Sequence, residues 1–258
     1  MKTVRHKVRL GVNIDHVATL RNARGQGHPS ITRAAETVLA AGADSITIHL
    51  REDRRHIRDA DVAQLMQHIR APLNLEMAAT AEMTAIACHH RPAYVCLVPE
   101  RRMEVTTEGG LNLVALSHHI QPCVSALKAA GIKVSLFIDA DDAQVQAAAL
   151  LGAHAIELHT GPYAAADDQH QAHALQRLTQ AAALGARLGL RIHAGHGLTF
   201  DNAGRVAAIP QVEELNIGHF LVGEALWHGL DAVVRQMIGV ICSAQQVANG
   251  PIDHVHST

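Results

Sequence analysis

The stretch SITIHLR (residues 45–51) alternates apolar and polar residues along its whole length. Because successive side chains of a β-strand point to opposite faces, its aliphatic residues share one face, and the other face carries Ser45, Thr47, His49 and Arg51. The stretch LNLEM (73–77) repeats the pattern, with Asn74 and Glu76 opposite its apolar residues. Both stretches therefore predict strands with one apolar face for packing and one face of chemically active groups.

Similar short runs recur along the chain and alternate with alanine-rich segments of helical spacing. The expected strands are 8–14, 45–50, 73–77, 94–98, 134–138, 155–159, 191–195 and 214–218. The expected helices are 31–41, 59–70, 81–90, 113–130, 142–151, 167–188, 201–209 and 220–247. Eight alternating pairs over 258 residues predict an α/β fold, a (β/α)8 TIM barrel with extra helices. A doubly wound open sheet is the alternative. We expect residues 1–258 to form a single domain with a frayed tail after residue 250.

Composition limits the classes of partner. Apolar residues make up 48% of the chain and aromatic residues 2%, so the core is aliphatic. A formal charge of −2 gives no reason to expect nucleic acid or a membrane surface as a partner. The four cysteines are far apart, which favours reduced thiols. No apolar run reaches the ~20 residues of a membrane helix, and the N-terminus does not resemble a signal peptide. We expect a cytoplasmic protein.

The polar residues gather toward the carboxyl ends of the expected strands, where barrel enzymes place their active sites. Candidates for proton transfer are His49, Glu76, Glu157 and His196. The arginine-rich loops after the first two strands and the glycine turns at 194–199 and 216–219 suit phosphate groups. The alternative is a hydrogen-bonded polar network that only fixes strand register.

Lysine is scarce and limits the possible chemistry. Of the four lysines, the strand candidate is Lys133, which lies at the start of the fifth expected strand and so at the wrong end, and an enzyme-bound imine is therefore not expected. A metal site is suggested by His49, His159, His193 and His196. However, the chain lacks the His-x-His after strand one and the aspartate after strand eight of many metallohydrolase barrels. We predict no metal and no organic cofactor, with a metal-dependent barrel hydrolase or isomerase as the alternative.

Eight motifs in order resemble those of one family, the pyridoxine 5′-phosphate synthases of the deoxyxylulose-dependent vitamin B6 pathway. They are GVNIDHVATLRNARG (11–25), ADSITIHLREDRRHI (43–57), LNLEM (73–77), LVPERRMEVTTEGGL (97–111), VSLFIDAD (134–141), IELHTGPYA (156–164), AGHGLT (194–199) and ELNIGH (214–219). Together they cover nearly the whole expected barrel. One departure is His193, at a position where many relatives have asparagine.

The resemblance implies an activity and a role for each matching residue. The family joins 3-amino-2-oxopropyl phosphate to 1-deoxy-D-xylulose 5-phosphate, closes a pyridine ring, releases phosphate and water, and assembles as homo-octamers. By motif position, His49 and Glu76 are proton acceptors, His196 is the proton donor, and Glu157 stabilises the transition state. The aminoketone phosphate contacts are Asn13, Gly197, Gly218 and His219. The deoxyxylulose phosphate contacts are Asp15, His16, Arg24, Arg51, His56 and Thr106.

Two further expectations concern the loop and the overall class of protein. Water-sensitive imine intermediates need a closed site, so we expect a mobile loop at 100–110, with paired glycines at its end. A barrel that binds phosphorylated metabolites without turnover is an alternative from a different class. The complete set of histidines and carboxylates favours the enzyme.

Overall fold

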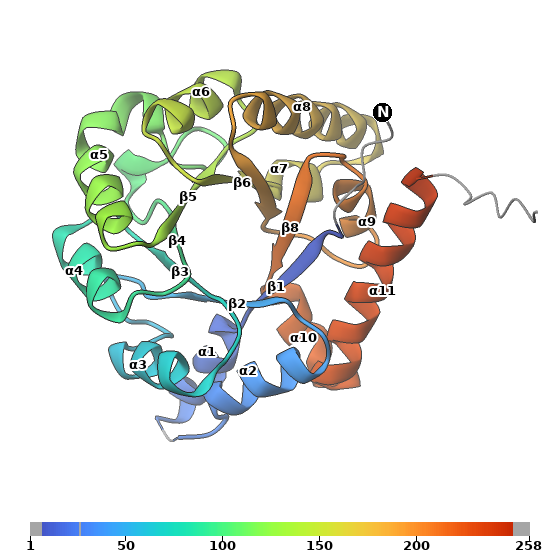
Figure 1. The fold of residues 1–258 in the computed structure, drawn as a ribbon. Coiled ribbons are helices and arrows are strands. Elements are labelled where there is room, and N and C mark those ends of the chain that lie inside the picture. The colour runs from blue at the N-terminus through green and yellow to red at the C-terminus, as the bar shows by residue number, and fades with distance from the viewer. Residues whose placement is uncertain (1–6, 26, 250–258) are drawn as a thin grey trace, which may run out of the picture.

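The computed structural model describes residues 7–25 and 27–249, and these form a closed barrel of parallel strands paired in sequential order (Figure 1). The predicted TIM barrel is confirmed, and the open-sheet alternative is wrong. The strands are β1 (Arg9–Asn13), β2 (Ser45–His49), β3 (Leu73–Met77), β4 (Tyr94–Leu97), β5 (Lys133–Ile138), β6 (Ala155–His159), β7 (Arg191–Gly195) and β8 (Val212–Ile217).

Helices form a ring outside the strands (Figure 1). They are α1 (Asp15–Arg24), α2 (Ile31–Ala40), α3 (Asp59–His68), α4 (Ala81–His90), α5 (Leu113–Ala129), α6 (Asp142–Leu150), α7 (Gly161–Ala165), α8 (Asp168–Arg187), α9 (Ala203–Ala207), α10 (His219–His228) and α11 (Leu230–Asn249), with a 3₁₀ turn, η1 (Arg102–Glu104). The expected tail after residue 250 lies outside the described residues.

Two segments differ from the sequence prediction. Residues 15–24, expected to be a loop, form α1, whose Arg21 donates through Nη2 to Asp61 Oδ2 of α3 at 2.9 Å. This buried ion pair holds a helix whose sequence shows little apolar periodicity. The single helix expected at 220–247 is divided into α10 and α11 at Gly229, where φ is +83°. Such a φ favours glycine and ends a helix.

The aliphatic face of each strand packs against the helices. Ile46 and Ile48 of β2 are fully buried, as are Leu75 of β3 and Leu136 of β5. Strands covered by helices on one side and closed around a barrel axis on the other expose neither face. This packing fixes the strand register, because a shift by one residue would turn the aliphatic set toward the axis.

The other face of the strands fills the barrel with polar side chains. Thr47 Oγ1 donates to Asn216 Oδ1 at 3.1 Å, and Asn74 Nδ2 donates to Thr47 Oγ1 at 3.4 Å. At the amino-terminal end, Arg9 Nε donates to Glu214 Oε2 at 2.9 Å. Burial, followed by the charges of Arg9 and Arg191, lowers the pKa of His193 to about 3. His193, inside the barrel, is therefore uncharged at neutral pH.

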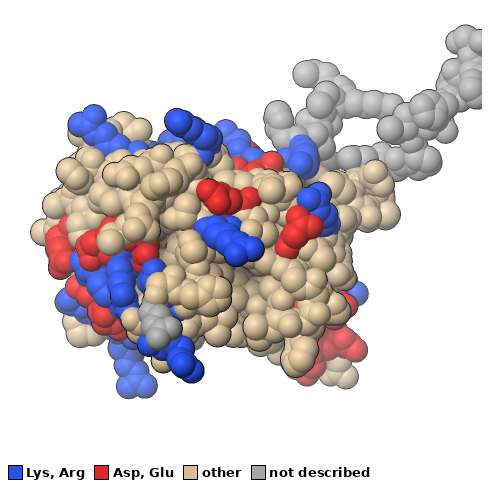
Figure 2. Space-filling view, turned by 90° about the horizontal axis from the view of Figure 1, so that it is seen from below, with Lys and Arg blue, Asp and Glu red and all other residues tan. Residues whose placement is uncertain are grey.

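The surface carries acidic and basic side chains close to one another on the face shown in Figure 2. Lys133 lies exposed at the start of β5, where its Nζ donates to Tyr94 Oη at 3.4 Å, so it is remote from the carboxyl ends of the strands. Within the described ranges, none of the helices combines the length and apolar character that crossing a membrane requires.

Candidate active site

A cavity of about 760 Å³ opens at the carboxyl ends of the strands. Twelve of the fourteen predicted site residues line it, contributed by strands and loops far apart in sequence. They are Asn13, Asp15, His16, His49, Arg51, His56, Glu76, Glu157, His196, Gly197, Gly218 and His219. The barrel therefore brings the candidates for proton transfer and for phosphate binding to one space.

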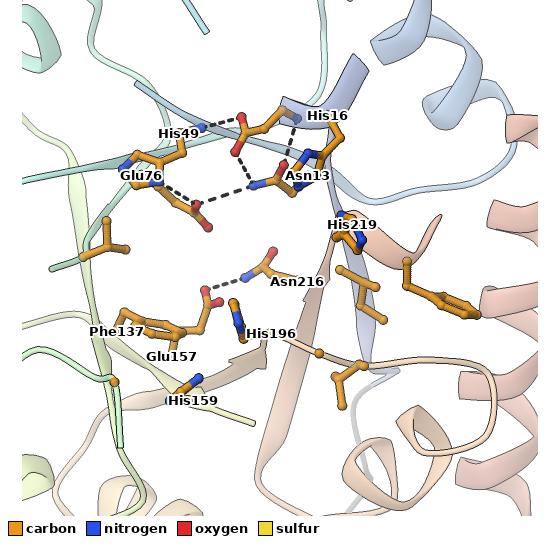
Figure 3. Close-up of a pocket in the computed structure, with 18 of the residues that line it drawn as sticks. Asn13, His16, His49, Glu76, Phe137, Glu157, His159, His196, Asn216 and His219 are labelled. Carbon is orange, nitrogen blue, oxygen red and sulfur yellow. Dashed lines mark hydrogen bonds and ion pairs between the residues drawn. The ribbon is translucent and has the colours of Figure 1, made fainter. Parts of the chain in front are cut away.

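One side of the cavity is a network in which Asp15 joins Asn13 and His49, which Figure 3 shows beside Glu76. Asp15 Oδ1 accepts from the His49 backbone N–H at 2.8 Å, and Asp15 Oδ2 accepts from Asn13 Nδ2 at 2.9 Å. Burial raises the pKa of Asp15 to about 6, against the opposing effects of His49 and Asn13. Glu76 Oε2 lies 3.8 Å from His49 Nδ1 and 3.5 Å from Asn13 Nδ2. A carboxylic acid and an imidazole thus face each other inside the cavity.

Glu76 and Glu157 are carboxyl groups held away from water. Burial raises the pKa of Glu76 well above its usual range, and the nearby Glu157 and Asp15 raise it further. Burial also raises the pKa of Glu157 to about 8, although a hydrogen bond from Asn216 Nδ2 at 2.7 Å opposes this shift. A pKa near 8 leaves Glu157 protonated at neutral pH in the free protein, and the raised pKa of Glu76 favours its protonated form.

Gly195 creates the space for Glu157. A Cβ at position 195 would lie 2.5 Å from Glu157 Oε1 and 2.7 Å from the Asn216 backbone oxygen. Because real Cβ atoms do not approach so closely, only glycine lets β7 run beside this carboxyl group.

The raised pKa of Glu157 predicts a pH-dependent stability. An acid with a folded pKa near 8 and an unfolded pKa near 4.5 keeps its proton in the fold over that interval. The free energy of unfolding should therefore fall as pH rises from 4.5 to 8, by at most ~1.4 kcal/mol per pH unit. Glu157→Gln should remove this contribution and flatten the decline. Urea unfolding at pH 5 and pH 8 measures it, and equal slopes for both proteins would contradict the shift.

His196 lies in the tight turn between β7 and α9, with φ +84°, in the left-handed region that disfavours a side chain. Buried Thr160 holds the turn, since its Oγ1 lies 2.7 Å from the Gly195 oxygen and 2.6 Å from the His196 oxygen. Burial lowers the pKa of His196, and the neighbouring His159 and His219 lower it further. Backbone strain of this kind is typical of functional positions.

Part of the rim of the cavity suits phosphate groups. His16, in the first turn of α1, lies edge-on to His219, the first residue of α10, with ring centroids 4.7 Å apart. Burial lowers the pKa of His56 to about 4, assisted by the charges of His49, His16 and Arg51. Helix amino-termini present free N–H groups, so an arriving anion meets donors, an arginine, and imidazoles whose protonation it would favour.

Arg24 and Thr106 lie outside this cavity. Arg24 is exposed at the end of α1. Thr106 lines a neighbouring cavity of about 310 Å³ and hydrogen-bonds to Asp139 Oδ2. Asp139 Oδ1 in turn accepts from the Gly110 N–H and from His159 Nδ1, each at 3.1 Å. The loop at 100–110 is thus tied to the wall of the site through Asp139.

Several site residues were missed by the sequence prediction. His159, named only as a possible metal ligand, lines the cavity 5.1 Å from the His196 ring, between centroids. It lies two residues after Glu157 in β6, so strand parity indicated it. Asn216, which begins the predicted turn at 216–219, was given no role of its own, yet it lines the cavity and donates to Glu157. Phe137 of β5 also lines the wall, and strand parity places it on the same face as Ser135.

Asp15, His49 and Glu76 have the geometry of a possible metal site. One ligand atom from each lies within 4.8 Å of the others. However, both Asp15 oxygens already accept hydrogen bonds, and burial favours the uncharged form of Glu76 by raising its pKa. A cation would have to compete with these hydrogen bonds and with a proton on Glu76.

Comparisons with known proteins agree with one another. The family described as pyridoxal phosphate biosynthesis protein PdxJ matches residues 10–243. A pyridoxine 5′-phosphate synthase of Gluconobacter oxydans is 57% identical over 236 residues, covering 92% of this chain and all of that protein. One of Zymomonas mobilis is 56% identical over 231 residues, covering 90% of each. Among solved structures, KGPDC from Streptococcus mutans has a TM-score of 0.66 at 14% identity, covering 93% of this chain and 100% of that one. At that identity, the structure shares the barrel fold alone.

Proposed function

The chain belongs to the family of pyridoxal phosphate biosynthesis protein PdxJ, and on that premise we propose that it is a pyridoxine 5′-phosphate synthase. It joins 3-amino-2-oxopropyl phosphate to 1-deoxy-D-xylulose 5-phosphate, closes the pyridine ring and releases phosphate and water. The observation that carries this function is the meeting of His49, Glu76 and His196 around one cavity with an anion-suited rim. The substrate supplies the amine, so the enzyme needs no lysine in the site.

The proton-transfer roles follow from the charge that each substrate brings. We propose His49 and Glu76 as proton acceptors. Burial raises the pKa of Glu76 and so disfavours its ionised form, whereas a substrate ammonium group beside it would favour the ionised form that accepts a proton. His196 is proposed as the donor. Because its pKa is lowered in the free protein, a nearby substrate phosphate would favour the imidazolium form that donates.

Glu157 and the binding residues complete the assignment. Glu157, held by Asn216 and neutral below pH 8, is proposed to stabilise the transition state through a hydrogen bond. We propose the two phosphate sites at the residues implied by the motifs. The aminoketone phosphate is assigned to Asn13, Gly197, Gly218 and His219. The deoxyxylulose phosphate is assigned to Asp15, His16, Arg24, Arg51, His56 and Thr106, with Arg24 and Thr106 lying outside the main cavity.

The expected assembly is a homo-octamer in the cytoplasm, and we propose no metal or organic cofactor. Exposed apolar side chains on α10 support self-association, since Leu226 is 67% and Trp227 is 79% exposed in the single chain. The mass of the purified protein in solution tests this proposal.

The function predicts phosphate release that depends on both substrates. Purified protein should release inorganic phosphate when both substrates are present and none with either substrate alone. Because no metal is assigned a step, EDTA should leave the rate unchanged. A phosphate assay with single-substrate controls measures this. Release from one substrate, or loss of activity on chelation with recovery on adding zinc or manganese, would instead support the metal-dependent hydrolase or isomerase.

A further inference from the structure

Glu100, in the segment after β4, places a buried carboxylate against His49. Its Oε1 lies 2.9 Å from His49 Nε2, and its side chain is only 5% exposed. Glu100 is not among the residues that line the cavity, whereas His49 is. The carboxylate therefore contacts the imidazole without belonging to the wall that would touch substrates.

The backbone of two loops holds Glu100 in this position. Its Oε2 accepts from the Glu52 N–H at 3.0 Å, and its own N–H donates to Glu104 Oε2 at 2.9 Å. Burial alone would raise the pKa of Glu100. Hydrogen bonds from His49 and the Glu52 N–H, with the charges of His49 and Arg51, outweigh burial and lower it. Glu100 is thus ionised at neutral pH, and an ionised carboxylate only accepts hydrogen bonds.

An acceptor at Nε2 determines which tautomer His49 adopts. In neutral imidazole one nitrogen carries hydrogen and the other accepts, so a carboxylate at Nε2 selects the form with hydrogen on Nε2. The lone pair is then on Nδ1, which lies 3.8 Å from Glu76 Oε2. The His49 backbone is fixed as well, because its N–H donates to Asp15. His49 is therefore held at Nε2 and at its backbone N–H.

We propose that Glu100 is a positioning residue that holds His49 in the Nε2–H tautomer and leaves Nδ1 as the proton-accepting atom. This deepens the proposed function, and its kinetic part rests on that function. When Nδ1 takes a proton, the electron pair of the broken bond stays on the substrate. The imidazolium that forms keeps its Nε2–H on Glu100, whose charge stabilises it. No other reactant is required.

The test is Glu100→Gln, which keeps the shape but removes the charge. The glutamine amide can turn its NH2 toward Nε2 and select the opposite tautomer. Nitrogen-15 NMR of histidine-labelled protein without substrates should show His49 protonated at Nε2 in the wild type and shifted toward Nδ1 in the variant. The His49→Asn protein identifies the signal. We expect kcat to fall on the order of 10²-fold, with KM changed little, because a wrongly placed base loses most of its contribution.

Glu52→Gln is the matched control. The Glu52 backbone N–H contacts Glu100, but the Glu52 side chain pairs with the exposed Arg101. This variant therefore removes one charge near Glu100 without changing a group that contacts His49. It should keep wild-type kcat and tautomer. A wild-type His49 carrying its hydrogen on Nδ1 would overturn the proposal without any variant, as would full activity in Glu100→Gln. If the wild-type protein did not convert the two proposed substrates, the proposed function would fail. The tautomer measurement would still decide whether Glu100 positions His49.

Discussion

Glu76→Gln is expected to lower kcat by about 10²- to 10⁴-fold without unfolding the protein. Glu76 lies inside the barrel, where burial and Glu157 raise its pKa, and glutamine has nearly the same shape without an exchangeable carboxyl proton. The variant therefore keeps the packing and loses only the ability to exchange a proton. Steady-state kinetics with both substrates, together with thermal unfolding, separates these effects.

The control for this experiment is Glu82→Gln on α4, an exposed carboxylate that pairs with Arg54 outside the cavity. It makes the same glutamate-to-glutamine replacement away from the cavity and should keep full activity. If Glu76→Gln retained activity within about threefold of wild type, Glu76 would have no part in proton transfer, because a general acid or base contributes far more than that.

His196→Asn should produce a loss of similar size, about 10²- to 10⁴-fold in kcat, if His196 is the proton donor. Asparagine tolerates the left-handed backbone conformation at φ +84°, so the turn between β7 and α9 should survive. The imidazole, which lies beside His159 and faces the cavity, is then the only functional group removed. Phosphate release with both substrates measures the effect.

His196→Gly is the companion variant. Glycine adopts this φ without steric cost, so it should match or exceed wild-type stability while losing the same activity as His196→Asn. That combination separates catalysis from folding. An active His196→Gly protein would remove His196 from the mechanism. A glycine variant less stable than wild type would show that the lost contacts of the imidazole and the greater freedom of the unfolded chain outweigh the relief of strain.

Strand periodicity made the barrel and most of its site predictable from the sequence. The alternation in 45–51 and 73–77 placed His49 and Glu76 on the polar face, and both now line the cavity. The helix at 15–24 was missed because its stability comes from the ion pair between Arg21 and Asp61, forty residues apart. Local periodicity carries no information about such a contact.

The sequence alone therefore determined the strand order, the inward face of each strand and the family, because these depend on local alternation and on motifs. Only the tertiary structure decided which inward groups keep a proton at neutral pH and which partners hold them. Desolvation and pair distances arise when separate segments meet, as Glu100 and His49 do across 51 residues. The tie from Thr106 through Asp139 to His159 likewise exists only in the folded barrel.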